Sequence, residues 1–222
     1  MGIPTPTPRV VYGTLLNDRD TLARLAQRFT EPPYKAPPAK PVLYIKPANT
    51  YAAEGAQVAV PADPGVVRID ATLGVAMARD ARRVDAAHAL DYVAGYVIAS
   101  DVTLPHDDIY RPPLRERCRD GFCPMTPCLP APAGFDPDGA VVEIAVNGSI
   151  VHRRSLRHLH RSTARLIADV SADLTLPAGA VLLLGTPEGA PLARPGDQIR
   201  IAVPGLGSLS HGLVADTSGD RA

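Results

Sequence analysis

Residues 141–153 read VVEIAVNGSIVHR, and this stretch decides the kind of fold that the sequence predicts. Two β-rich runs flank Asn147-Gly148, a dipeptide typical of the type I′ turn of a β-hairpin. Similar short apolar runs, bounded by turn residues, occur at 42–46, 57–60, 66–69, 73–78, 97–100, 180–184, 198–203 and 209–214. Because Pro and Gly separate runs of strand length, the pattern indicates a protein built mainly of β-strands.

Three segments show the apolar spacing of helices instead. The first lies near 18–29, where Asn17 is the expected N-cap. The second is a short helix that begins at Asp85 and for which Gly95 suits the C-cap, and the third lies near 156–171. The side chains expected to face the core are Leu22, Leu25, Ala26 and Phe29, then Ala87, Leu90, Val93 and Ala94, then Leu159, Leu166, Ile167 and Val170.

Many strands with a few helices predict the α+β class, mainly β. We see no internal repeat and no linker that would divide the chain, so we expect one domain over residues 1–222. Within it, residues 1–55 form a lead-in region with the first helix, 56–215 a β-rich core, and 216–222 a flexible tail.

The composition excludes several classes of function. The chain has 222 residues with 23 basic and 23 acidic side chains, a formal net charge of zero. It therefore lacks the electrostatic footprint of a non-specific nucleic-acid or anionic-membrane binder. No apolar run approaches the roughly 18 residues of a membrane span, and residues 1–10 do not resemble a signal peptide. The three cysteines fit reduced thiols, so we expect a cytoplasmic protein.

Residues 101–135 combine many charges and prolines with little periodicity. Such a long segment is uncommon in a compact domain unless it has a function. Its arginines suit a substrate with several carboxylates, because a guanidinium pairs with a carboxylate bidentately. For any one of them, a solvated face neutralised by nearby acids is about as plausible. These arginines are Arg111, Arg115, Arg117 and Arg119, and the last three alternate as on one face of an extended chain.

Several separated motifs carry a resemblance to a known family. They are DATLGVAMARDARRV (70–84), AGYVIASDVT (94–103), YRPPLRERCRDGFCPM (110–125), VNGS (146–149), LLLGTPEG (182–189) and RPGDQIRIAVPGLGSL (194–209). With them, the chain resembles the fumarylacetoacetate-hydrolase-like (FAH-like) family over about residues 40–214. YRPPLRERCRDG, YKAPPAKP and GFCP are similar to its 4-hydroxyphenylacetate (homoprotocatechuate) branch, where a bifunctional isomerase/decarboxylase has two fused homologous halves. The resemblance is to the N-terminal half, and implies an FAH-like mixed β-sandwich roll.

The resemblance implies metal-assisted chemistry. In this family a divalent ion, Mg²⁺ or Mn²⁺, is held by carboxylates and stabilises the enolate of a 2-oxo acid substrate. The Glu-x-Glu ligands of the family fall on Asp70 and Thr72, and its downstream acid falls on Asp101. One carboxylate is thus shortened and another lost. We therefore expect Asp70, Thr72 and Asp101 to form a degenerate site that binds Mg²⁺ weakly or not at all.

The resemblance also implies catalytic positions. The Lys of the family falls on Arg117, which keeps the charge but essentially never deprotonates. Its N-terminal His and Glu fall on Thr21 and Arg24, so no obvious general base remains there. His106 lies where relatives often have an acid and is the histidine to test for acid–base work. Arg117, His106 and Asp101 are accordingly the candidate catalytic residues.

Other positions are expected to contact substrate or to have a structural role. Thr186 matches a family Thr of a substrate-binding loop, although Leu184 replaces the preceding one, and Lys46 matches a Lys-Pro at the rim of the site. The candidate substrate-binding residues are Tyr110, Arg111, Arg119, Thr186 and Lys46. The cysteines, taken as packing residues, are Cys118, Cys123 and Cys128. The histidines expected to be exposed are His152, His158 and His160.

Two readings of the function remain open. In the first, the chain is itself a metal-dependent isomerase or decarboxylase of an unsaturated 2-oxo polycarboxylate, of the 5-oxopent-3-ene-1,2,5-tricarboxylate decarboxylase and 5-carboxymethyl-2-hydroxymuconate isomerase type. In the second, it is a catalytically degenerate subunit that pairs with an intact homologue. A carboxylate-binding protein is a third, weaker alternative. The resemblance implies at least a dimer, either a homodimer or a hetero-oligomer with a homologous FAH-like subunit.

Overall fold

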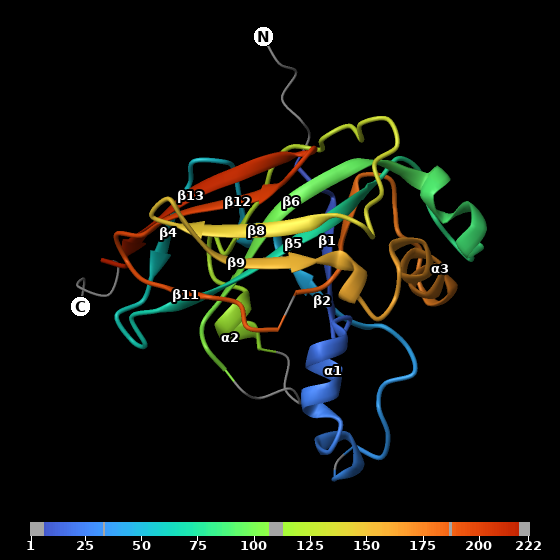
Figure 1. Cartoon of the computed structure of the whole chain (residues 1–222), viewed down its shortest axis with the longest axis horizontal. Coiled ribbons are helices and arrows are strands. Elements are labelled where there is room, and N and C mark those ends of the chain that lie inside the picture. Colours follow the sequence, from blue (N-terminus) through green and yellow to red (C-terminus); the bar gives the residue numbers. More distant parts are fainter. Residues whose placement is uncertain (1–6, 33, 107–112, 187, 218–222) are drawn as a thin grey trace.

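The strands form two sheets with the apolar core between them, in a computed structural model that describes residues 7–32, 34–106, 113–186 and 188–217 (Figure 1). In the first sheet the order is β11-β5-β10-β1-β2, and β6 also pairs with β5, antiparallel. Its strands are β1 (Val10–Leu15), β2 (Val42–Lys46), β5 (Val67–Met77), β6 (Val93–Thr103), β10 (Ala180–Leu183) and β11 (Leu192–Ala193).

The second sheet has the order β4-β13-β12-β8-β9. Its strands are β4 (Gln57–Val60), β8 (Val141–Val146), β9 (Ser149–Ser155), β12 (Gln198–Val203) and β13 (Gly207–Ala215). A small parallel pair joins β3 (Tyr51–Ala52) to β7 (Cys123–Pro124). Buried side chains of both sheets, such as Leu73, Ile98, Ile144 and Ile201, belong to one apolar cluster. This packing explains why the apolar runs of the sequence alternate with turn residues.

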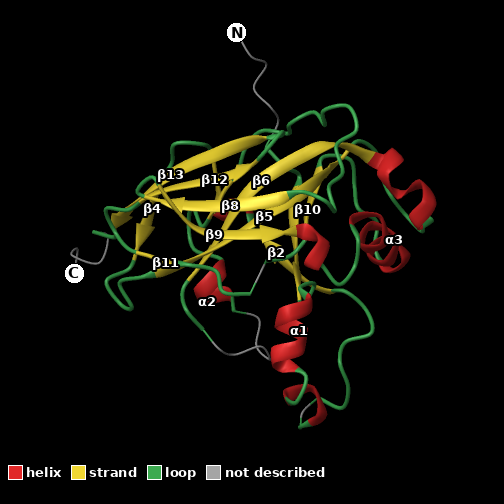
Figure 2. Cartoon of the chain, in the orientation of Figure 1, coloured by secondary structure: helices red, strands yellow, loops and turns green. Residues whose placement is uncertain are grey.

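Helices are few and lie at the borders of the sheets (Figure 2). The α-helices are α1 (Arg19–Leu25), α2 (Leu114–Arg117) and α3 (Thr163–Asp173). The 3₁₀ helices are η1 (Arg28–Thr30), η2 (Ala48–Thr50), η3 (Ala86–Tyr92) and η4 (Leu156–His158). The α+β, mainly β class predicted from the sequence is confirmed. In the described part of the chain, no helix is long and apolar enough to cross a membrane.

The predicted hairpin is confirmed. Asn147 and Gly148 have φ of 52° and 84°, as a type I′ turn requires, between the paired strands β8 and β9. The two strands expected at 66–69 and 73–78 are instead one long strand, β5. It continues through its polar residues because they find partners inside the protein, described below.

The helix boundaries differ from those predicted. Asp18 rather than Asn17 caps α1, because its side chain accepts a hydrogen bond from the backbone N–H of Thr21. Asn17 is buried and donates to the carbonyl of Leu184. The third helix begins at Thr163 and not at 156, with Ser162 as its cap. The four side chains expected to be buried there are buried: Leu159, Leu166, Ile167 and Val170.

The predicted helix from Asp85 to Gly95 was wrong at its C-terminal end. The segment is the 3₁₀ helix η3, and Leu90, expected inside, is 43% exposed. Gly95 lies within β6, where a Cβ atom would come within 2.3 Å of the carbonyl oxygen of Leu129. The glycine therefore permits a close backbone approach and does not cap a helix.

Candidate functional site

Two facing carboxylates define the site. β5 and β6 pair antiparallel with Asp70 directly opposite Asp101, so the two side chains share one face of the sheet. Their side chains are only 3% and 0% exposed. Burying two charges this close is unfavourable unless cations neutralise them. The chain supplies those cations from β2, from α2 and from β5 itself.

Arg117, the last residue of α2, bridges the two carboxylates. Its Nη1 lies 2.7 Å from Oδ2 of Asp101, and its Nη2 lies 3.0 Å from Oδ2 of Asp70. Burial alone would lower the pKa of the guanidinium, but the two carboxylates raise it above its ordinary value. The side chain therefore stays charged at any physiological pH.

Lys46, at the end of β2, has no solvent exposure. Its Nζ donates to Oδ1 of Asp101 at 2.9 Å and to the carbonyls of Arg117 and Phe122 at 2.6 and 3.0 Å. Its predicted position at the rim of the site is wrong, because these three acceptors hold the ammonium inside the protein. Lys46 thus ties β2, β6 and the segment after α2 together.

Tyr44 and Arg68 complete the cluster that Asp70, Asp101, Arg117 and Lys46 form. Neither of the two was predicted from the sequence. The hydroxyl of Tyr44 donates to Oδ2 of Asp101, and burial together with that carboxylate raises the pKa of the tyrosine well above its usual value. Arg68 donates from Nε and Nη2 to Oδ1 and Oδ2 of Asp70, at 3.0 and 3.2 Å. Each lies two residues from a cluster member on the same strand, and this spacing was the available signal.

The charges around Asp101 fix its protonation state. Burial would raise the pKa of this carboxyl, but Lys46 and Arg117 lower it below its ordinary value, and the hydrogen bond from Tyr44 acts in the same direction. A carboxylate with a lowered pKa and a guanidinium with a raised one exchange no proton near neutral pH. The cluster is therefore suited to hold fixed charges rather than to transfer protons.

The residues present do not fit a divalent ion. All four carboxylate oxygens of Asp70 and Asp101 already accept hydrogen bonds from Arg68, Lys46 or Arg117. Thr72, at the lost ligand position, donates its hydroxyl to the carbonyl of Gly185 at 2.8 Å. Three cations thus face two carboxylates, and a dication would add to an excess of positive charge.

The rest of the described residues offer no such site either. No group of three or more His, Cys, Asp or Glu side chains is placed to hold a metal ion within residues 7–32, 34–106, 113–186 and 188–217. The weak or absent Mg²⁺ binding expected from the sequence stays a prediction, which the paired carboxylates support.

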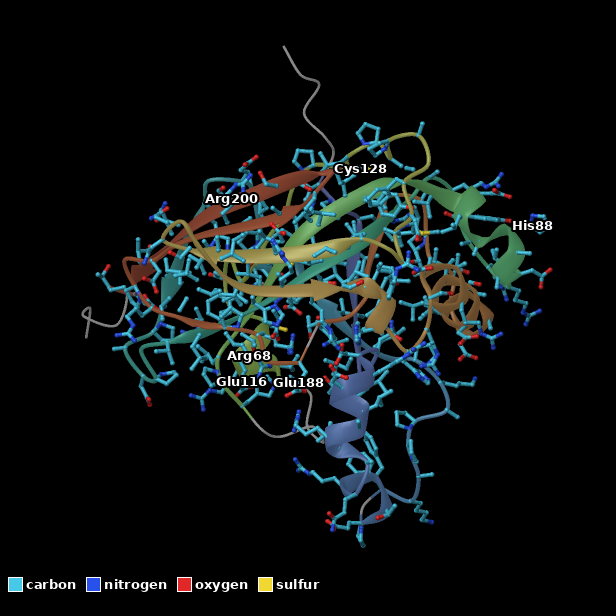
Figure 3. All side chains as sticks on the ribbon, viewed as in Figure 1. Arg68, His88, Glu116, Cys128, Glu188 and Arg200 are labelled. Atoms are coloured by element: carbon cyan, nitrogen blue, oxygen red, sulfur yellow. The ribbon has the colours of Figure 1, made fainter. Side chains whose placement is uncertain are left out.

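The positions of the expected general base are engaged with Glu188. Thr21 donates its hydroxyl to Oε2 of Glu188 at 2.9 Å, and Nε of Arg24 lies 2.8 Å from Oε1. In Figure 3, Arg68 and Glu188 lie at the border of the sheets where α2 and α1 are found. Glu188, two residues after the half-buried Thr186, is thereby bound to α1.

The predicted arginine face is not formed. Residues 114–117 are helical, so the alternating arginines point in different directions. Arg115 is exposed, Arg117 is buried, and Arg119 lies 3.7 Å from Asp216. Tyr110 and Arg111 lie outside the described residues.

The histidines and cysteines show no shared site in the described part of the chain. Nδ1 of His106 lies 2.9 Å from the carbonyl of Leu104, a local contact, and its acid–base role stays a prediction. His158 and His160 are exposed as expected, whereas His152 is half-buried on β9. Cys123 is fully buried, which raises the pKa of its thiol to about 12. Cys118 and Cys128 are also free and partly buried, as packing residues can be.

Comparisons with known proteins agree with this fold. The model of the fumarylacetoacetate (FAA) hydrolase C-terminal family matches residues 10–214. A 4-hydroxyphenylacetate degradation bifunctional isomerase/decarboxylase of Salmonella dublin is 36% identical over 206 residues, which are 93% of this chain and 47% of that protein. The chain spans about half the length of the first curated relatives it matches.

Solved structures are similar over nearly the whole chain. A 5-carboxymethyl-2-hydroxymuconate delta-isomerase from Mycobacterium smegmatis matches with a TM-score of 0.78 and 27% identity, over 95% of this chain and 80% of that one. A fumarylpyruvate hydrolase from Pseudomonas aeruginosa, solved in complex with Mn²⁺ and pyruvate, matches with a TM-score of 0.79 over 97% and 99% of the two chains. At 22% identity, the second likeness concerns the fold alone.

Proposed function

The chain belongs to the fumarylacetoacetate hydrolase family, and we propose that it works as the catalytically degenerate partner of a homologous unit with an intact metal site. Together the two units would form an isomerase/decarboxylase of the homoprotocatechuate meta-cleavage type. The observation that carries this proposal is the neutralisation of Asp70 and Asp101 by Arg117, Lys46 and Arg68. In this arrangement the carboxylates are not free to hold an ion, so the partner would have to hold the metal ion that stabilises an enolate of the substrate.

The lengths of the relatives support a second unit. More than half of the Salmonella dublin isomerase/decarboxylase lies outside the match to this chain. The engagement of Thr21 and Arg24 with Glu188 supports the same view, because neither position carries a free base.

Co-expression tests the proposal. Three preparations are compared. They are this chain alone, a homologous FAH-type unit that has the Glu-x-Glu pair and the Lys alone, and the two produced together. We expect a stable mixed complex, with Mg²⁺-dependent turnover of an unsaturated 2-oxo tricarboxylate that needs the intact unit. Full turnover by this chain alone, or failure of the two units to copurify, would contradict the proposal.

The second candidate is catalysis by this chain itself on the same class of 2-oxo polycarboxylate, with Mg²⁺ or Mn²⁺. The observation that favours it is the retention of two carboxylates in register on β5 and β6. Under this candidate, the chain produced alone would turn over the substrate with Mg²⁺ or Mn²⁺, and Asp101→Asn would abolish that turnover. Under the first proposal, a folded Asp101→Asn complex keeps its turnover.

A further inference from the structure

We propose that the guanidinium of Arg117 is a built-in replacement for a divalent cation between Asp70 and Asp101, and that it masks a latent cation site. Removing the guanidinium would let Mn²⁺ or Mg²⁺ bind where its two Nη atoms now lie. The inference shares with the proposed function the observation that the two carboxylates are neutralised, but it concerns ion binding by this chain alone and not pairing or turnover.

The first support is the bridging geometry. One Nη atom contacts each carboxylate, at 2.7 and 3.0 Å, and the contacted oxygen is Oδ2 in both cases. A single cation therefore joins the two strands at one register pair, as a metal ion shared by two carboxylates would do.

The second support is burial. The side chain of Arg117 is only 4% exposed, and its Nε finds no hydrogen-bond partner among the described residues. An unpaired buried N–H is unfavourable, so this side chain is not placed to satisfy all its donors. Its position is explained by the two carboxylates at its tip.

The third support is that the backbone of Arg117 is held independently of its side chain. Its N–H donates to the carbonyl of Pro113 at 2.9 Å, and its carbonyl accepts from Nζ of Lys46 at 2.6 Å. Truncating the side chain should therefore leave α2 in place and open space beside both Oδ2 atoms. The hydroxyl of Tyr44, which donates to Oδ2 of Asp101, also borders this space.

The chemistry of the vacated space suits a hard cation. Carboxylate and hydroxyl oxygens are the ligands preferred by Mg²⁺ and Mn²⁺. Loss of Arg117 leaves Asp70 and Asp101 with Lys46 and Arg68 only, so one positive charge fewer opposes the binding of an ion.

The test is Mn²⁺ binding to the isolated full chain, followed by thermal unfolding and by electron paramagnetic resonance of free Mn²⁺. We expect Arg117→Ala to unfold at a lower temperature than the wild type in EDTA, and to gain about 4 °C or more with millimolar Mn²⁺. Adding Asp70→Asn to Arg117→Ala should abolish that gain. The matched control is Arg119→Ala, two residues along the same segment, which should not respond to Mn²⁺.

The wild-type chain keeps the test decisive if the variant fails to fold. Its unfolding temperature should be the same in EDTA and in millimolar Mn²⁺, because Arg117 occupies the place of the ion. A rise in the wild type, a folded Arg117→Ala variant without Mn²⁺ binding, or an equal response in Arg119→Ala would each overturn the inference. None of these results measures activity or pairing, so each is separate from a failure of the proposed function.

Discussion

Lys46 shows how a charged residue is accommodated with no solvent exposure. A buried ammonium is unfavourable unless its three N–H groups are all satisfied and its charge is paired. Asp101 provides the counter-charge, and two backbone carbonyls accept the remaining hydrogen bonds. Because Asp101 also pairs with Arg117, a single carboxylate stabilises two buried cations.

The first prediction concerns that carboxylate. Asp101→Asn should lower the free energy of unfolding by about 3–5 kcal/mol, since it leaves Lys46 and Arg117 with too little counter-charge. Urea unfolding of the isolated chain measures the change. The matched control is Asp173→Asn, which breaks an exposed pair with Lys40 and should cost less than about 1 kcal/mol. Equal losses of unfolding free energy in the two variants would show that the buried ion pairs stabilise the fold no more than an exposed pair does.

The second prediction is the pH dependence of the same contribution. The pKa of Asp101 is lowered in the folded protein, so its stabilisation is complete above the unfolded value of about 3.9 and is lost as the pH falls through the lower folded value. The difference in unfolding free energy between the wild type and Asp101→Asn should therefore be constant near neutral pH. It should narrow only below about pH 4. Narrowing already near neutral pH would show that the pKa is not lowered.

The sequence anticipated some of these residues and not others. The resemblance indicated that Asp70 and Asp101 share a site, and they are register partners. The burial of Lys46 could not be predicted, because its acceptors at Arg117 and Phe122 lie 71 and 76 residues away along the chain. Only the fold brings such partners together. The catalytic and substrate-binding roles assigned to these residues stay predictions.

At the scale of elements, β6 is the strand that joins two separate segments, β5 and the segment after β7. It pairs with β5 on one side, and on the other the segment that follows β7 approaches it closely. Tyr96 and Leu129 exchange two backbone hydrogen bonds, at 2.8 and 2.7 Å. The helix expected to end at Gly95 was a reasonable reading of a local pattern, but this long-range pairing requires a glycine within the strand.

The third prediction tests that close approach. Gly95→Ala should destabilise the protein by about 1–3 kcal/mol, because the added Cβ meets the carbonyl of Leu129 and Sγ of Cys128 at 2.3 and 2.8 Å. Chemical unfolding measures the loss. Gly207→Ala is the matched control, since its Cβ meets the flexible ends of the Leu129 and Ile98 side chains, at 3.1 and 3.9 Å. A harmless Gly95→Ala would mean that the two segments lie farther apart.

The fourth prediction concerns the contact between α1 and Glu188. Glu188→Gln should speed amide hydrogen exchange in α1, because the carboxylate that binds Thr21 and Arg24 loses its charge. The free energy of unfolding should change by less than about 1 kcal/mol, since both ion-pair partners are partly exposed. Glu143→Gln breaks an ion pair on β8 and should leave exchange in α1 unchanged. Unchanged exchange in Glu188→Gln would show that the contact does not hold the helix.

At the scale of the whole molecule, the class of fold was predictable and the strand order was not. Strand-length apolar runs and turn residues are local signals, so the α+β, mainly β class followed from them. The sheet order depends on which strands meet. The position of β1 inside the sheet, with β10 on one side and β2 on the other, has no local signature.

The position of β1 has a consequence for the order of folding. Val10 pairs in parallel with Ala180, so β1 gains this neighbour only after most of the other strands have been synthesised, whereas β2 follows it closely. The β8–β9 hairpin, by contrast, closes across two residues. Contacts between distant parts of a chain form later than local ones, because closing a long loop costs more conformational entropy.

The fifth prediction follows. In refolding followed by pulsed hydrogen exchange, amides of β8 and β9 should be protected before those of β1, and β1 should gain protection together with β10. Early protection of β1 alone would contradict this order. Until β10 arrives, β1 presents an unpaired edge, the part of a nascent chain most exposed to pairing with a wrong strand. We therefore expect the growing chain to be most open to mispairing at this edge during the interval between the two strands.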